Sequence, residues 1–190
     1  MPFIALKKSS QERVDITKIK NPRQELVKDD IICQLCGTPM VIKAGVIKRP
    51  HFAHKPNTLC QTDYGYHPES PEHLAGKEFI AKILMKELTD YTNAEITYEW
   101  RCEETKRVAD VAVLFRNGWI VVHECQLSSI TVEELEKRTE DYLNAGIDVV
   151  WWLGKNADTN TNRSWCIDTF GECNLIDYKE LSISSNIGNA

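Results

Sequence analysis

The pattern of apolar and polar positions after residue 70 predicts two helices and four strands. Ser70 followed by Pro71 is typical of a helix start, and this helix extends to about residue 88. A second, amphipathic helix begins at the caps in 129–131 and ends near residue 144, before Gly146. The strand-like runs are 95–101, 107–115, 119–126 and 147–153.

These elements follow one another as helix, three strands, helix and strand. Asn117-Gly118 lies between the second and third strands and is a strong hairpin turn. A meander followed by a right-handed crossover to a parallel strand gives an α/β/α layered core. After Gly154 the pattern predicts loops that alternate with weak strands, and a polar end that frays.

The segment before residue 63 has a different pattern and predicts a small module of its own. Residues 1–32 form a polar lead-in with a few β-like apolar positions. Two short apolar runs, 41–43 and 46–48, are separated by Ala44-Gly45 and predict a β-hairpin. We therefore expect an N-terminal part at 1–62 and a larger domain at 63–190.

Length and composition fit a folded protein with one domain and a small appendage. The 190 residues are 42% apolar and 27% charged, which excludes wholesale disorder. Every apolar run is shorter than the roughly 20 residues that cross a bilayer. The start of the chain has too short an apolar stretch, with its charges on the wrong side, for a signal peptide. We therefore expect a cytoplasmic protein that makes no membrane contact.

The charge is distributed unevenly along the chain. The formal net charge is −5, but residues 1–60 carry eleven Lys and Arg against five Asp and Glu, and the rest is acidic. This balance argues against a protein that coats nucleic acid by charge alone. It predicts that any polyanion binds mainly to the basic residues of 1–60. The alternative is that these charges are simply exposed to solvent and bind no partner.

A set of cysteines and histidines near the N-terminus has the spacing of a zinc site. Cys33-x2-Cys36 is followed by His51-x2-His54, and a two-residue gap lets a tight knuckle aim both side chains at one ion. A module of about thirty residues buries too little core to fold alone, so a structural zinc would hold it together. If the histidines lie on a strand they face opposite sides, and Cys60 could then replace one of them.

Two observations bear on the alternative, which is a pair of buried thiols and two surface histidines. The chain has seven cysteines, an odd number, and no secretory signal. Both features argue against a disulfide framework and favour metal ligation plus buried thiols.

A second group of polar residues lies on the predicted strands. Asp110 stands inside an apolar strand that turns over into the strand bearing Glu124 and Gln126, which share one face. Two carboxylates on adjacent strands suit Mg²⁺, which prefers oxygen ligands. The alternative is a structural hairpin with surface charges, but an unpaired carboxylate within such an apolar run is costly.

The first predicted helix adds polar groups to the same region. His73 and Lys77 share a stripe with Ile80 and Leu84, so they point toward the sheet. Lys77 is thereby expected to approach the strand of Glu124, unless it is a surface residue whose stem covers apolar area. Glu72, in the first turn, is a further candidate carboxylate.

Taken in chain order, these motifs resemble the competence protein CoiA-like nucleases over about residues 30–153. The motifs are Cys33/Cys36, His51-Phe52-Ala53-His54, Glu69-Ser70 with His73 and Lys77, Arg107 with Asp110-Val111, Glu124-Cys125-Gln126-Leu127-Ser128, Arg138 with Tyr142, and Val150-Trp151-Trp152. The pieces are weak one by one and fairly specific in this order.

The resemblance implies a restriction-endonuclease-like PD-(D/E)xK fold, a mixed sheet flanked by helices, behind a zinc-bound hairpin module. It makes Asp110 and Glu124 ligands of a catalytic Mg²⁺ or Mn²⁺, and it puts Gln126 in the place of the usual lysine. Glutamine can orient a water but cannot accept its proton or supply charge, so Lys77 becomes the candidate replacement. Arg138, on the face shared with Tyr142, either contacts phosphate or pairs with Glu134.

The implied function is a metal-dependent nuclease that hydrolyses DNA phosphodiester bonds in DNA processing or recombination. Its candidate catalytic residues are Asp110, Glu124, Gln126, Lys77, Glu72 and His73. The alternative is a catalytically inactive nuclease-fold module that binds nucleic acid or a protein partner. Gln126 and the acidity of the core favour that alternative, whereas the pair Asp110 and Glu124 favours the enzyme.

Overall fold

The computed structural model describes residues 2–45, 49–64, 69–177 and 179–187. Their strands are β1 (Ile4–Lys7), β2 (Arg13–Asp15), β3 (Ile31–Ile32), β4 (Met40–Lys43), β5 (His51–His54), β6 (Glu95–Cys102), β7 (Arg107–Leu114), β8 (Ile120–Gln126), β9 (Asp148–Leu153), β10 (Glu172–Asp177) and β11 (Ser182–Ile187). Their helices are η1 (Ile16–Lys18), α1 (Pro22–Glu25), η2 (Lys28–Asp30), α2 (Pro71–Phe79), η3 (Ile80–Leu84), α3 (Met85–Glu87), η4 (Thr89–Tyr91), α4 (Val132–Asn144) and α5 (Asn160–Phe170). In these residues no helix is long and apolar enough to span a membrane.

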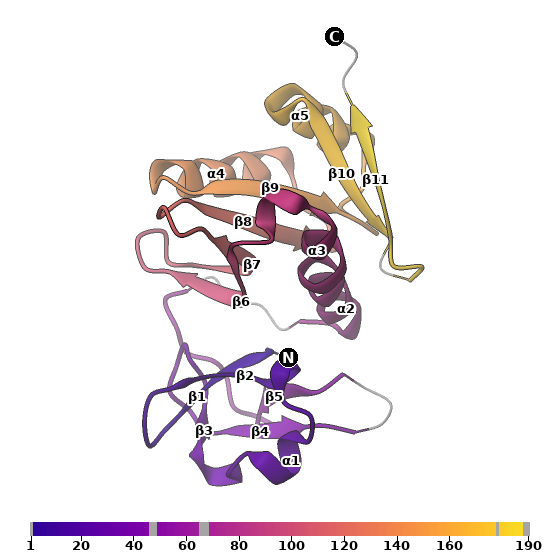
Figure 1. Ribbon diagram of the computed structural model, residues 1–190. Coiled ribbons are helices and arrows are strands. Elements are labelled where there is room, and N and C mark those ends of the chain that lie inside the picture. Colours follow the sequence, from indigo (N-terminus) through magenta and orange to yellow (C-terminus); the bar gives the residue numbers. More distant parts are fainter. Residues whose placement is uncertain (1, 46–48, 65–68, 178, 188–190) are drawn as a thin grey trace.

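A six-stranded mixed sheet forms the centre of the larger part of the protein (Figure 1). Its order is β11-β10-β9-β8-β7-β6. β6, β7 and β8 are antiparallel, while β8, β9 and β10 run parallel. The predicted meander and the crossover through α4 to a parallel strand are confirmed.

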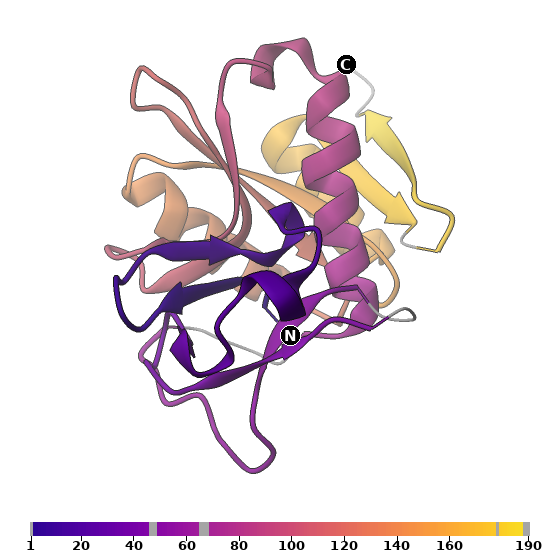
Figure 2. The ribbon, with the colours of Figure 1, turned by 60° about the horizontal axis from the view of Figure 1, so that its bottom comes forward.

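Helices cover both faces of this sheet, so the predicted α/β/α layering is confirmed. The helix α2–η3–α3 crosses one face, where Leu74, Ile80 and Leu84 share a core with apolar residues of β1, β6 and β8 (Figure 2). On the other face α4 and α5 bury Leu135, Tyr142 and Cys166 against the sheet. The mixed sheet flanked by helices matches the fold class that the sequence predicts.

The first helix starts and runs as its sequence predicts. Ser70 is its N-cap, the hydroxyl accepting from the backbone N–H of His73 over 3.2 Å, and Pro71 is the first helical residue. The helix continues through a π-helical turn, η3, to Glu87. Gly76 lies where this helix meets β8, because a Cβ there would stand 2.6 Å from Cys125 Sγ.

We expect Gly76→Ala to lower the free energy of unfolding by about 1–3 kcal/mol, the usual cost of overpacking a core. This loss opposes the helix propensity of alanine, which alone would stabilise the protein. Urea denaturation measures the change. Cys125→Ala in the Gly76→Ala background should recover part of the loss by removing the sulfur. Wild-type stability of Gly76→Ala would show that the helix and β8 are not in close contact.

The segment after Gly154 differs in part from its prediction. It contains strands as predicted, β10 and β11, but it also forms the helix α5, which the pattern does not predict. Thr159 caps α5 by accepting from the backbone N–H of Asn162, and Gly171 ends it with a φ of 81°. These local signals were present, but α5 has only a weak apolar stripe, so the pattern of apolar positions did not reveal the helix.

The N-terminal part contains two small sheets. β2, β1 and β3 form one. In the other, β4 pairs antiparallel with β5, so a hairpin is present but its second strand is His51–His54 instead of the predicted run 46–48. The run 46–48, the expected second strand, lies outside the described residues. A boundary between residues 62 and 63 stays a prediction.

β1 fastens this N-terminal part to the large sheet. The backbone N–H groups of Phe3 and Ile4 donate to the Glu99 carboxylate on β6, over 2.7 and 3.1 Å. The Phe3 ring packs edge-on against Tyr98, with ring centroids 5.0 Å apart. The N-terminal part is therefore held against β6, the edge strand next to β7.

Candidate active site and metal centre

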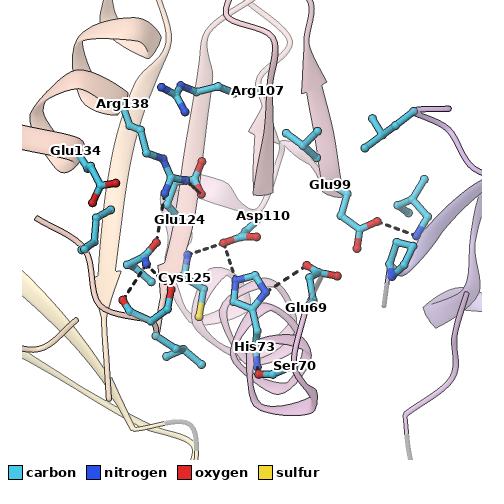
Figure 3. A pocket seen from close by; sticks show the side chains of 18 of the residues that line it. Glu69, Ser70, His73, Glu99, Arg107, Asp110, Glu124, Cys125, Glu134 and Arg138 are labelled. Atoms are coloured by element: carbon cyan, nitrogen blue, oxygen red, sulfur yellow. Dashed lines mark hydrogen bonds and ion pairs between the residues drawn. The ribbon is translucent and has the colours of Figure 1, made fainter. Parts of the chain in front are cut away.

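A cleft of about 590 Å³ opens where the N-terminal part, α2, the central strands and α4 meet. Its polar and charged lining side chains come from six places in the chain, and Figure 3 shows several of them. They are Gln34, Glu69, Ser70, His73, Glu99, Arg107, Asp110, Glu124, Gln126, Ser128, Ser129, Glu134, Lys137 and Arg138. Of the six predicted catalytic residues, Asp110, Glu124, Gln126 and His73 line this cleft.

The strand register brings three carboxylates into one row across the sheet. Tyr98 pairs with Val111 and Trp100 with Ala109, so Glu99 on β6 lies opposite Asp110 on β7. Val111 also pairs with His123 on β8. One residue further along these antiparallel strands, Asp110 lies opposite Glu124, on the side away from Glu99. Residues directly opposite in an antiparallel pair share a face, so Asp110 and Glu124 are neighbours as predicted.

Asp110 is held by α2 and by the neighbouring strand. Its Oδ2 accepts from Nε2 of His73 over 3.0 Å and from the backbone N–H of Cys125 over 2.8 Å. The other ring nitrogen of His73 lies 3.2 Å from Glu69, so the imidazole stands between two carboxylates (Figure 3). Burial opposes the charge on His73, but Asp110 and Glu69 outweigh it and raise its pKa to about 10. His73 is therefore an imidazolium at neutral pH.

Glu124 is held from the opposite side by α4. Its Oε2 accepts from Nη2 of Arg138 over 2.9 Å, and its Oε1 accepts from the Tyr142 hydroxyl over 2.6 Å. Burial raises the pKa of Glu124, and the Arg138 guanidinium counteracts that effect. Nη1 of Arg138 also donates to Oε1 of Gln126 over 3.2 Å. Arg138 thus pairs with Glu124 rather than with Glu134.

Lys77 and Glu72 do not lie where the sequence places them. Lys77 points toward the sheet, as its stripe predicts, but it meets β6 instead of the strand of Glu124. It is fully buried, forms ion pairs with Glu69 and with Glu99, the latter over 2.7 Å, and does not line the cleft. The reason is that Gly76, one residue earlier, is the position that contacts β8, and each helical residue turns by about 100°. Glu72 lies outside the cleft lining as well.

We expect Lys77→Met to cost about 3–5 kcal/mol of unfolding free energy, because it leaves the buried Glu99 carboxylate without a cation and Glu69 with His73 alone. Urea denaturation of the metal-free protein measures this loss. Combining Lys77→Met with Glu99→Gln should recover part of it, since the charge of Glu99 is then removed. If Lys77→Met unfolds at the wild-type urea concentration, the buried ion network is wrong.

A second group of possible metal ligands lies in the N-terminal part. Cys33, Cys36, His54 and Cys60 present ligand atoms that all lie within 4.8 Å of one another. Cys36 Sγ is 3.4 Å from Nε2 of His54. Burial opposes ionisation of the Cys36 thiol, but hydrogen bonds with Thr38 and His54 lower its pKa to about 6. A thiolate at neutral pH is the form that binds a metal.

His51 is not part of this group, and Cys60 is. Both histidines lie on β5, where positions three apart face opposite sides, so only one can turn toward the cysteines. His51 is buried, with Nδ1 2.8 Å from the backbone oxygen of Arg49. The structure thus brings together the variant of the predicted ligand set in which Cys60 replaces His51.

Comparison with protein families covers both parts of the chain. Residues 69–183 match the nuclease-like domain of competence protein CoiA, and residues 13–63 match its N-terminal domain. The chain belongs to the competence protein CoiA family. Competence protein CoiA of Bacillus subtilis strain 168 is 31% identical over 161 residues, which are 83% of this chain and 41% of that protein. The chain therefore spans less than half the length of this curated relative.

One solved structure with a similar arrangement is a repair endonuclease from Pyrococcus abyssi. It is 18% identical, with a TM-score of 0.34, over 72% of this chain and 58% of that chain. A likeness this distant does not bear on function. The CoiA nuclease-like match, by contrast, contains the whole row of carboxylates together with His73 and Arg138.

Sequence reasoning missed Glu99 as a member of the site. It has a φ of 49°, which is rare outside glycine, and its carboxylate joins β1 to Lys77. Between Tyr98 and Trp100 a single glutamate gives no local sign of burial. Its role follows only from the long-range contact between β6 and the N-terminal strand, which the sequence pattern does not encode.

Proposed function

We propose that this protein is a metal-dependent nuclease that hydrolyses DNA phosphodiester bonds, as part of DNA processing or recombination. The observation that supports it is the pair Asp110 and Glu124, side by side on β7 and β8 at a charged cleft within the nuclease-like match. Arg107, Lys137 and Arg138 line the same cleft and suit a polyanionic substrate.

The residues around Asp110 and Glu124 fit Mg²⁺ or Mn²⁺. Carboxylate oxygens are the ligands that these ions prefer, and the backbone carbonyl of Cys125 is a candidate third oxygen. The ion-pair network around these two residues joins four carboxylates to three cationic side chains, so within this network carboxylates outnumber cations by one. The carboxylates are Glu69, Glu99, Asp110 and Glu124, and the cations are His73, Lys77 and Arg138. When bound, such an ion activates a water and neutralises charge on the phosphate.

The protein's own residues orient the reactants. His73 holds the Asp110 carboxylate in place through a hydrogen bond of 3.0 Å, while its own charge keeps that carboxylate ionised. Burial favours neutral Asp110, but His73 and Lys77 outweigh it and hold its pKa below the usual range. Gln126, whose amide donates to Ser128, positions the attacking water by hydrogen bonds without accepting its proton.

We also propose that Cys33, Cys36, His54 and Cys60 hold a structural zinc. Three sulfurs and one imidazole nitrogen are a ligand set typical of structural zinc, and their atoms lie close enough together to bind one ion. The surrounding sheets are small, with two and three strands. A metal compensates for the limited apolar core that such small sheets bury.

The test of the nuclease is direct. Labelled single-stranded, duplex and branched DNA are incubated with the protein in Mg²⁺, in Mn²⁺ and in EDTA, with Asp110→Asn purified in parallel to reveal contaminating nucleases. The proposal predicts products from at least one substrate in a divalent ion and none in EDTA. Intact DNA throughout, from a folded protein, would overturn it.

A second function, binding of nucleic acid or a protein partner without catalysis, is favoured by one observation. Both oxygens of Glu124 already accept hydrogen bonds, from Arg138 and Tyr142, and Gln126 carries no charge. A binding module would retain these contacts permanently. The same samples separate the two functions, since a module of this kind shifts DNA in a binding assay, or captures a protein, and leaves the DNA intact.

A further inference from the structure

Arg138 reaches both members of the Glu124-x-Gln126 motif at once. From α4 its Nη2 donates to Glu124 over 2.9 Å and its Nη1 donates to Gln126 over 3.2 Å. The guanidinium lies over the Trp151 ring, 4.8 Å from its centroid, a cation–π contact that supports the side chain. A positive charge therefore stands directly beside Gln126, which has none.

The guanidinium also has hydrogen-bonding capacity to spare. Arginine carries five N–H donors, and the contacts with Glu124 and Gln126 use two of them. Its Nε has no hydrogen-bond partner among the described residues. Nε itself is buried, but the side chain as a whole lines the cleft and is 25% exposed, so part of the guanidinium is open to a bound ligand.

Besides Arg138, the cations His73 and Lys137 line the cleft but form no hydrogen bond with Glu124 or Gln126 among the described residues, and two further cations near the motif are engaged elsewhere. Lys77 is fully buried between Glu69 and Glu99, outside the cleft lining. Arg107 lines the cleft, but its guanidinium is bound to Asp141, with Nε at 2.9 Å. Arg138 is thus the cation that both touches the motif and faces the cleft.

We propose that Arg138 is a catalytic residue that places its positive charge on the phosphate under attack, in place of a charge at position 126. This inference rests on the proposed nuclease function. In the hydrolysis a water oxygen forms the new P–O bond and loses its proton to solvent, while the bond to the leaving oxygen breaks and that oxygen takes up a proton. Negative charge grows on the non-bridging oxygens, and a planar guanidinium stabilises it with two parallel hydrogen bonds.

The ion pair with Glu124 is then the resting position of Arg138. The guanidinium shares Glu124 with the Tyr142 hydroxyl, so this carboxylate keeps one partner when Arg138 moves to a phosphate. Glu124 becomes available to a divalent cation by the same displacement. One movement of one side chain thus prepares both the metal ligand and the phosphate contact.

The test moves the positive charge from position 138 to position 126. Single-turnover cleavage is measured at saturating Mg²⁺ for Arg138→Met, for the double variant Arg138→Met with Gln126→Lys, and for the control Arg163→Met, whose arginine pairs with Asp158 outside the cleft. We expect Arg138→Met to be slower by about 100-fold or more, the usual cost of losing one transition-state donor. The double variant should cleave about 10-fold or more faster than Arg138→Met, because its lysine restores a positive charge at position 126. Arg163→Met should cleave at the wild-type rate.

A second readout does not depend on catalysis. DNA affinity is measured in Ca²⁺ over a range of salt concentrations, and Arg138→Met should reduce the slope of log affinity against log salt by about one phosphate contact, unlike Arg163→Met. If Arg138 had only a structural role, Arg138→Met would leave this slope unchanged, and adding Gln126→Lys would not restore cleavage. If Arg138→Met does not fold, Arg138→Gln replaces it in both measurements.

The outcomes separate this inference from the nuclease proposal. Cleavage by wild type and by Arg138→Met at equal rates overturns the role of Arg138 and leaves the nuclease intact. A slow Arg138→Met without rescue by Gln126→Lys and with an unchanged salt slope makes the arginine structural and also overturns it. Absence of cleavage by folded wild type overturns the nuclease, and with it this inference.

Discussion

Asp110→Asn should lower the rate of metal-dependent DNA cleavage by at least about 1000-fold, equivalent to roughly 4 kcal/mol of transition-state stabilisation. The substitution removes the central charge of the carboxylate row while keeping the shape of the side chain. The asparagine oxygen can still accept from the backbone N–H of Cys125, which Asp110 now receives over 2.8 Å. The fold should therefore survive, and the loss should appear in single-turnover cleavage at saturating DNA.

A matched control is Asp90→Asn, which changes an exposed aspartate of η4 away from the cleft and should cut DNA at the wild-type rate. Circular dichroism and urea denaturation should show both variants folded. Wild-type cleavage by folded Asp110→Asn would mean that the carboxylate row is not the catalytic centre.

Replacing Cys36 and Cys60 together by serine should abolish zinc binding and unfold the N-terminal part. Removing two of four ligands withdraws most of a binding free energy that is about 10–16 kcal/mol in zinc-finger peptides. Metal analysis should find about one zinc per wild-type chain and almost none in the variant. Limited proteolysis should then cut within residues 2–64 while the large sheet stays protected.

The matched control for this experiment is Cys166→Ser with Cys173→Ser, which changes two buried cysteines far from the metal group. This control should keep its zinc. A wild-type protein purified without chelator that contains no zinc would contradict the assignment, as would a Cys36→Ser, Cys60→Ser variant that retains it.

The core elements were predictable because their signals are local. Ser70 and Thr131 start helices by accepting backbone N–H groups within the next turn, and Asn117-Gly118 closes a hairpin between neighbouring strands. The alternation of side chains along strands was enough to put Asp110 and Glu124 on a common face. The family was predictable from the order of its motifs, although each motif alone is short.

The partners of each charged residue were not predictable, because they depend on contacts between distant segments. The pattern of the first helix correctly predicted that Lys77 points toward the sheet. It could not predict which strand Lys77 contacts, because a shift of one position along the helix changes the strand, and the position that contacts β8 is Gly76. Glu99 became part of the site through β1, which lies 95 residues or more away in sequence. Arg138 was expected to contact phosphate or to pair with Glu134, whereas the packing of α4 on the sheet pairs it with Glu124.

The most direct test of the central claim is an anomalous difference map from a crystal of the wild-type protein grown with Mn²⁺. We expect a manganese peak between Asp110 and Glu124, at about 2.1 Å from an oxygen of each, with Arg138 withdrawn from Glu124. A peak that appears only at the Cys33, Cys36, His54 and Cys60 group, or none at all beside Asp110, would contradict it.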